Sequence, residues 1–146
     1  MRQIFLVDNS VLQRLHRSDE VASALTELLS MGELGGCLPQ LLEEGYSARS
    51  AAEHHLIRSA NARARIFLPP DAEVAEIALD LQSGLFAAGI GRAVGVSDLQ
   101  IAATAIGHTT DAQRVTVVHY DADFEHVARV APEFRHRWIV PRGSVA

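Results

Sequence analysis

The stretch QIFLVDNS, residues 3–10, begins the pattern that decides the fold. Its first part, residues 3–7, is a short and mostly apolar run of β-forming residues, which predicts a buried strand. The run ends at Asp8, and Asn9 and Ser10 then favour the start of a helix. We therefore expect a strand whose carboxyl end carries an acid and leads directly into a helix.

The same pattern returns near the other end of the chain, where RVTVVHY, residues 114–120, is followed by Asp121. Short apolar runs at 36–38 and 138–140 predict two more strands, and a brief run at 66–68 stays unassigned. Helical spacing of apolar residues fills most of the remaining chain, although the boundary between the second and third helices stays open. The predicted helices cover residues 19–31, 40–49, 50–65, 71–85, 97–108 and 124–131.

Strands that alternate with helices predict an α/β fold, with a central parallel sheet covered on both faces. The helix at 97–108 is apolar on nearly every side, so it should lie deep in the domain. In such sheets ligands bind at the carboxyl ends of the strands, near the point where the strand order reverses. A chain of 146 residues that is 48% apolar has the size of one compact unit, so we expect a single domain over residues 1–146.

The composition excludes several kinds of chemistry. Cys37 is the only cysteine, which excludes an internal disulfide and a cysteine-based zinc site and favours a reducing compartment. All thirteen basic residues are arginines, so mechanisms that need a lysine, such as Schiff-base chemistry or a phosphate-binding P-loop, are excluded.

The charge and the hydropathy pattern limit the possible partners. A net charge of −5 argues against a domain that holds nucleic acid by bulk attraction to phosphates. It is compatible with a nuclease whose acids surround metal ions. Because no apolar run reaches the roughly 18 residues of a membrane-spanning helix, we expect a cytoplasmic protein with no membrane partner.

Four acids are expected to converge on the carboxyl edge of the sheet. Asp8 and Asp121 directly follow strands. Asp98 opens the buried helix, and Glu43 lies early in the helix after the second strand. Carboxylates packed together repel one another, so such a cluster is stable at neutral pH mainly with hard divalent cations bound. Mg²⁺ or Mn²⁺ suits oxygen ligands, and such an ion can promote hydrolysis of a phosphodiester by water.

Each acid also has a purely structural interpretation. Asp8 can cap a helix, and Asp98 can complement a helix dipole. Asp121 and Asp123 can act as turn and capping residues at the end of a strand. Of the neighbours at 43 and 44, one is expected on a solvated helix face. The shared placement at one edge of the sheet is what favours a functional cluster.

The histidines and the cysteine point less clearly to a site. His54 and His55 are neighbours on a helix and point in different directions, so we interpret them as surface residues. His119 faces the same side of its strand as the acid at 121, which allows a supporting role, although a half-buried structural role is the simpler interpretation. Cys37 is expected to be a small buried hydrophobe.

Five segments together resemble the successive motifs of PIN-domain ribonucleases, and most closely the VapC-type toxins of VapBC toxin–antitoxin pairs. The resemblance covers the chain from end to end in the family's order. It implies a three-layer α/β/α domain with a central parallel sheet and a recessed Mg²⁺ site that cuts single-stranded or loop regions of RNA. The segments are LVDNSVL (6–12), LLEEGYSAR (41–49), SDLQIAATA (97–105), VVHYDADFEHVA (117–128) and WIVPRGS (138–144).

The resemblance also assigns roles to individual residues. Glu43 is preferred over Glu44 because the family's glutamate lies three residues before a tyrosine, here Tyr46. Gly45 stands where many relatives carry an aliphatic residue, which implies a looser start of that helix. Ser10 matches the hydroxyl residue that supports the first metal ligand. The family's catalytic and metal-binding acids fall on Asp8, Glu43, Asp98 and Asp121, with a further acid of many members on Asp123.

The resemblance further implies a homodimer, an RNA substrate and a small cognate antitoxin of the VapB type. Such an antitoxin is expected to insert an arginine among the acids. It should also lay a helix in a groove between the helix at 21–29 and the helices after Pro39.

Three other functions stay open. A receiver-type phosphoacceptor domain also carries acids at strand ends, but it normally needs a lysine that this chain lacks. A catalytically inactive PIN-type module could bind RNA or a partner without cutting. A metal-dependent phosphatase or nuclease could act on DNA instead.

Overall fold

A single parallel sheet of five strands forms the centre of the molecule; the computed structural model describes all 146 residues. The strands are β1 (Arg2–Val7), β2 (Glu33–Cys37), β3 (Ile66–Leu68), β4 (Gln113–His119) and β5 (His136–Trp138). Their order across the sheet is β3-β2-β1-β4-β5, and every neighbouring pair is parallel. The predicted parallel sheet is thus confirmed, and the unassigned run at 66–68 is its edge strand.

The strand order reverses between β1 and β4. After β1 the chain builds β2 and β3 on one side, and it then returns to place β4 against the other side of β1. Val7 pairs with Val118 in the register of β1 and β4, so the two strands end at the same edge. Asp8 and Asp121 follow these ends, which puts both acids at the switch point where open α/β sheets bind ligands.

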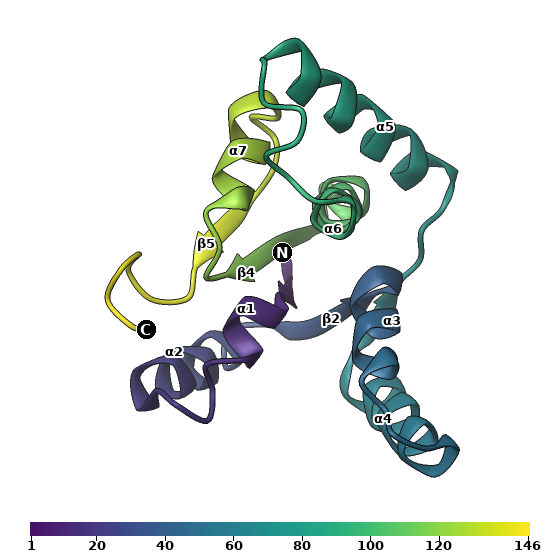
Figure 1. Ribbon diagram of the computed structural model, residues 1–146, viewed down its shortest axis with the longest axis vertical. Coiled ribbons are helices and arrows are strands. Elements are labelled where there is room, and N and C mark those ends of the chain that lie inside the picture. The colour runs from purple at the N-terminus through teal and green to yellow at the C-terminus, as the bar shows by residue number, and fades with distance from the viewer.

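Helices cover both faces of the sheet, so the predicted three-layer arrangement is confirmed. On one face α5, α6 and α7 pack against Ile4, Leu6 and Val117. On the other face α1 and α2 pack against Phe5 and Val7 (Figure 1). The helices are α1 (Asn9–Leu12), α2 (Asp19–Leu29), α3 (Leu38–Tyr46), α4 (Ala51–Ala64), α5 (Ala72–Ala87), α6 (Val96–His108) and α7 (Asp123–Val130).

Helix α6 lies deep in the domain, as its apolar composition predicts. It packs between α5 and the sheet and presents buried side chains on several sides. A helix buried in this way cannot shift without disturbing the core, so its amino-terminal turn is a rigid support. The buried residues of α6 are Leu99, Ile101, Ala102, Ala103, Thr104 and Ala105.

Helices α3 and α4 form a pair that projects beside the sheet (Figure 1). Ser50 separates them, because its side chain accepts a hydrogen bond from the backbone N–H of Glu53 and caps α4. The expected looser start of α3 is not seen, since α3 runs through Gly45 without a break. A Cβ at Gly45 would lie 3.1 Å from His54 Nε2, so the glycine lets the two helices approach closely.

Two predicted strands are misplaced by a few residues at both ends, since β2 covers Glu33–Cys37 instead of 36–38 and β5 covers His136–Trp138 instead of 138–140. Leu38 begins α3 and does not end β2, because Pro39 favours the first turn of a helix. Strand β5 ends at Trp138, although Ile139 and Val140 beyond it are buried. These two side chains pack in the core beneath α1 and α2 from an irregular segment, which an apolar run alone does not distinguish from a strand. None of the helices is both long and apolar enough to cross a membrane.

Candidate active site

Asp8 is fixed at the carboxyl end of β1. It is 7% exposed, and its Oδ2 accepts a hydrogen bond of 3.1 Å from the backbone N–H of Ser10, which caps α1. The hydroxyl of Ser10 accepts a 2.8 Å bond from the backbone N–H of Tyr120. The predicted capping role of Asp8 is therefore confirmed. The hydroxyl of Ser10 ties the start of α1 to the end of β4.

Asp121 is held by the backbone on both sides. Its N–H donates to Nδ1 of His119 at 3.1 Å, and its Oδ1 accepts the N–H of Asp123 at 2.9 Å. The second bond orders the first turn of α7, as the structural interpretation of these acids predicts. The carboxylate of Asp121 and the backbone of Asp123 are thus fixed relative to the end of β4.

Three carboxylates meet next to this strand end. Asp98, Asp121 and Asp123 each offer a carboxylate oxygen, and the three oxygens lie within 4.8 Å of one another. Burial, followed by the negative charges of Asp8, Asp121, Asp123 and Glu43, raises the pKa of Asp98 to about 7. Burial and the charge of Asp121 also raise the pKa of Asp123. The repulsion expected from clustered acids is therefore present.

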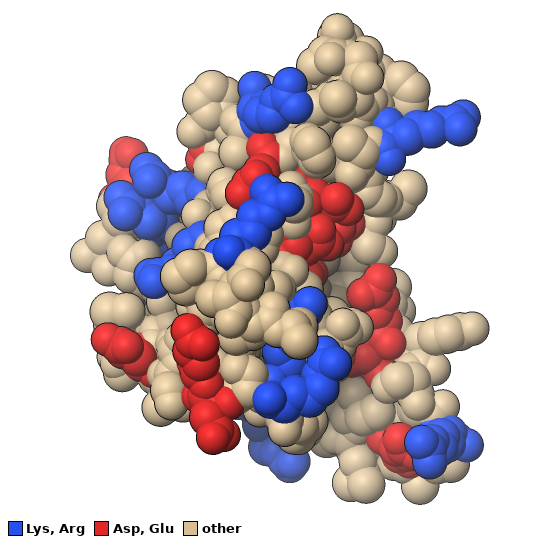
Figure 2. Space-filling view, turned by 60° about the vertical axis from the view of Figure 1, so that its left-hand side comes forward, with Lys and Arg blue, Asp and Glu red and all other residues tan.

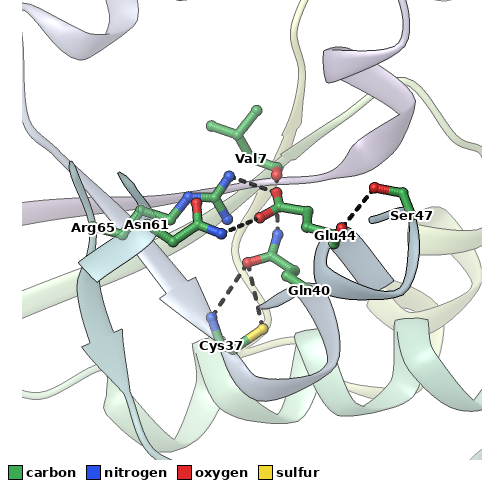
Figure 3. Close-up of polar contacts among 7 residues, drawn as sticks. All are labelled: Val7, Cys37, Gln40, Glu44, Ser47, Asn61 and Arg65. Atoms are coloured by element: carbon green, nitrogen blue, oxygen red, sulfur yellow. Dashed lines mark hydrogen bonds and ion pairs between the residues drawn. The ribbon is translucent and has the colours of Figure 1, made fainter. Parts of the chain in front are cut away.

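Glu43 and Glu44 have different surroundings. Glu44 forms a 2.6 Å ion pair with Arg65 and accepts a 2.8 Å hydrogen bond from Asn61 (Figure 3). Its carboxylate is half-buried and engaged, so the one residue of this pair that we expected on a solvated helix face is Glu43. Glu43 is exposed at the rim of the site, and its charge reaches Asp98. This contrast favours Glu43 as the free acid of the pair.

Gln40 anchors α3 to the switch point. Its amide N–H donates to the carbonyl of Val7 at 3.0 Å, and its Oε1 accepts from the backbone N–H of Cys37 at 3.4 Å (Figure 3). Gln40 is 5% exposed, so these bonds are shielded from water. Cys37 is fully buried as predicted, and burial raises the pKa of its thiol to about 12. The cysteine is therefore an inert packing residue.

A polar pocket of about 450 Å³ lies between the end of β1 and the α3–α4 pair. Asp8 and Glu43 form the side that faces the acid cluster, and Glu44, Asn61 and Arg65 line it farther away. The pocket therefore opens beside the acids. We call it the polar pocket below.

The structure gives His119 a partner that the sequence did not predict and places a further histidine, His126, beside the acids. His119 is fully buried, and its Nε2 lies 2.8 Å from Nδ1 of His136. His126 follows Asp123 by three residues on α7, and its charge lowers the pKa of Asp123 against the other influences there. The Nδ1 of His126 is buried without a hydrogen-bond partner. The i, i+3 spacing from Asp123 was the available signal for His126, whereas nothing in the sequence pairs His119 with His136.

The surface around the site carries both signs of charge. Figure 2 shows acidic groups gathered near the middle of one face, with arginine side chains around them. Because no lysine is present, every blue group there is an arginine or its stem. A negative centre with a basic surround suits a substrate that is itself anionic, provided that cations offset the charge of the acids.

The donor set fits a hard divalent cation. The three clustered groups are all carboxylates, which are the ligands that Mg²⁺ and Mn²⁺ prefer. No ion pair joins an arginine or histidine to any of the three carboxylates, and burial together with the neighbouring acids raises the pKa of Asp98. The fit thus rests on the chemistry of the ligands and on their unbalanced charge.

Comparison with known proteins shows the family of the chain. The sequence matches the family model described as PIN domain over residues 5–130. Ribonuclease VapC51 of Mycobacterium tuberculosis is 35% identical over 141 residues, which cover 97% of this chain and 96% of that protein. Ribonuclease VapC21 of the same species is 32% identical over 140 residues, 96% of each chain.

Solved structures agree on the fold. VapBC-1 from nontypeable Haemophilus influenzae has a TM-score of 0.70 at 15% identity and covers 93% of this chain and 98% of its own. VapBC2 from Rickettsia felis, bound to a DNA fragment from their promoter, has a TM-score of 0.69 at 16% identity, with coverages of 92% and 98%. The chain therefore belongs to the PIN-domain family and is a relative of the VapC ribonucleases.

Proposed function

We propose that this chain is a metal-dependent endoribonuclease toxin of a VapBC-type pair, formed by a single PIN domain over residues 1–146. The observation that carries this proposal is the meeting of the Asp98, Asp121 and Asp123 carboxylates within 4.8 Å at the switch point of the sheet. The identities of 32% and 35% to named ribonucleases over almost the whole chain support it independently. The residues that would hold Mg²⁺, or Mn²⁺ as a substitute, are Asp8, Glu43, Asp98, Asp121 and Asp123.

When bound, a divalent cation supplies a water of lowered pKa and offsets negative charge on a phosphodiester. The chain's own residues prepare the site for this chemistry. Asp8 and Asp121 are fixed by hydrogen bonds to backbone N–H groups at the switch point. Asp98 lies on the rigid first turn of α6. Its pKa is about 7 in the metal-free site, so a nearby positive charge is needed to keep this carboxylate fully ionised at neutral pH.

His119 is not accessible to a substrate and cannot act as a general base. Its two ring nitrogens face Asp121 and His136 in hydrogen bonds, and it is fully buried. Burial and then the charge of His136 lower the pKa of His119 to about 3. Its role is therefore to support the strand end, and its buried and engaged ring cannot act as a base for a ribose hydroxyl.

The proposed partner is an antitoxin of the VapB type, in keeping with the solved VapBC complexes that share this fold. The acid cluster can accept an inserted arginine, because a planar guanidinium pairs with carboxylates. The groove was expected between α2 and the helices after Pro39, and the structure supports only the part formed by those later helices. The apolar groove runs between α3 and α4, with Leu38, Leu42 and Ile57 among its walls and no residue of α2. A homodimer remains part of this proposal.

A single cleavage gel tests the proposal. Purified chain is incubated with end-labelled RNA in Mg²⁺, in Mn²⁺ and with EDTA. We expect discrete fragments in either metal and intact RNA with EDTA. Intact RNA in Mg²⁺ together with a shifted band on a native gel would instead identify a module that binds RNA without cutting. If a DNA strand of the same sequence is cleaved faster than the RNA, the preferred substrate is DNA and the proposed RNA specificity is wrong.

A further inference from the structure

We propose that the polar pocket binds the nucleobase of a nucleotide that directly flanks the bond being cut, and so gives the enzyme its sequence preference. This inference rests on the proposed function. The pocket is the hollow of about 450 Å³ beside Asp8 and Glu43. A volume of this order accommodates a small ring system.

The position of the pocket fixes which part of the RNA can enter it. Asp8 lines the pocket at the end of β1, and β1 ends beside β4, which leads to Asp121 of the acid cluster. A phosphodiester placed at the cluster therefore has the pocket as an immediate neighbour. The base of the adjoining nucleotide is the group that can reach the pocket from there.

The lining of the pocket carries an ion pair that joins the carboxyl end of α4 to α3. Arg65 and Glu44 lie 2.6 Å apart, with side chains that are 10% and 23% exposed. Removing such charges from water costs about as much as their attraction returns, so a buried ion pair is weak evidence for stabilisation. A role in recognition accounts better for its place beside the acid cluster.

The polar groups in the pocket retain capacity for a ligand. One nitrogen of Arg65 donates to Glu44, and the remaining N–H groups of the guanidinium have no side-chain or backbone acceptor. Asn61 uses Nδ2 to donate to Glu44, and its Oδ1 accepts no bond. A donor and an acceptor thus stand together in the pocket, which matches the mixed edge of a nucleobase.

The charge balance favours a base over a phosphate. Glu44 neutralises Arg65, so the pocket offers no free positive charge to hold a phosphate. A neutral ring with dipolar edges needs no such charge. Ile57 and Ala60 supply apolar surface for the face of such a ring. The structure therefore points to a nucleobase as the ligand.

The test uses an RNA oligonucleotide that the chain cleaves, with single abasic nucleotides placed on either side of the cut. For the wild-type chain we expect kcat/KM to fall by roughly tenfold when one of the two flanking bases is missing, because two or so hydrogen bonds are lost. Abasic nucleotides three or more positions away should change the rate by less than about twofold.

An abasic nucleotide also removes base stacking within the RNA. A variant that fills the polar pocket distinguishes this effect from the loss of a base bound in the pocket. Ala60→Phe adds a ring to the lining of the pocket and leaves every acid and both members of the ion pair in place in the sequence. The Ala60→Phe variant should cleave the intact RNA with a kcat/KM about tenfold below that of the wild type. Its kcat/KM should not fall further when the flanking base is missing. Ala51→Phe carries the same substitution at an exposed position of α4 outside the pocket and should behave as the wild type. Thermal melting and Mn²⁺ binding of each variant should match the wild type.

The inference is overturned if neither flanking abasic nucleotide changes the wild-type rate, a comparison that needs no variant. It is also overturned if Ala60→Phe folds, cleaves, and shows the same abasic penalty as the wild type. Both results come from an enzyme that cleaves RNA, so they leave the proposed function intact. A wild-type chain that cuts no RNA in Mg²⁺ would instead overturn the proposed function.

Discussion

His119 Nε2 lies 2.8 Å from His136 Nδ1, and this contact determines the protonation of both rings. The N–H of Asp121 donates to Nδ1 of His119, so that nitrogen carries no proton. The proton of neutral His119 is then on Nε2, and it is donated to His136. The pair thereby connects the outer strand β5 to the backbone of an acid in the site.

This contact predicts different effects for two substitutions of His119. Asn places an oxygen near the position of Nδ1 and keeps an acceptor for the N–H of Asp121, whereas Gln reaches towards His136 and loses that acceptor. We expect His119→Asn to bind Mn²⁺ within about threefold of the wild type and His119→Gln to bind roughly tenfold more weakly, as is common for residues that orient metal ligands. Calorimetric titration with Mn²⁺ measures both. Equal losses in two folded variants would show a purely structural role.

The stability of the metal-free protein should depend on pH through Asp98. Its pKa is about 7 in the folded chain and about 4 in an unfolded one. The folded chain therefore keeps a proton that the unfolded chain has released, and stability falls as the pH rises from about 4 to 7. Asp98→Asn removes this contribution. In EDTA, we expect the melting temperature of the wild type to fall by roughly 5 °C more than that of Asp98→Asn between pH 5 and pH 7.5. Parallel curves would mean that the carboxyl is not crowded by its neighbours.

The products should carry 5′-phosphate and 3′-hydroxyl ends. Attack by water leaves these ends, whereas attack by a ribose 2′-hydroxyl requires a base and leaves a 2′,3′-cyclic phosphate. His119 is buried with both nitrogens engaged, so it cannot serve as that base. Mass spectrometry of the fragments identifies the ends. Cyclic phosphates that disappear in His126→Gln would assign the chemistry to the histidine beside Asp123.

The sequence predicted the parts of the site that follow from strand ends. Asp8 and Asp121 stand at the carboxyl ends of β1 and β4 because a run of β-forming residues stops at each of them, and parallel pairing then brings the two ends together. The depth of α6, and hence the support under Asp98, followed from its apolar surface on nearly every side.

Other parts depend on tertiary contacts that no local pattern contains. Glu44 and Arg65 come together only because α3 and α4 pack side by side, across twenty-one positions of sequence. His119 meets His136 only through the pairing of β4 with β5. The carboxyl end of β5 was misplaced because Ile139 and Val140 are buried without belonging to the strand.

The initial rate of RNA cleavage by Asp98→Asn in Mg²⁺ tests the central claim most directly. The substitution keeps the size of the side chain and removes a charge from the acid cluster, and Asp80→Asn makes the same change at an exposed position of α5. Circular dichroism should show both variants folded. The carboxylate-cluster account predicts that Asp98→Asn loses at least about a thousandfold in rate, while Asp80→Asn stays within about twofold of the wild type. A folded Asp98→Asn variant that cuts RNA at a near wild-type rate would contradict it.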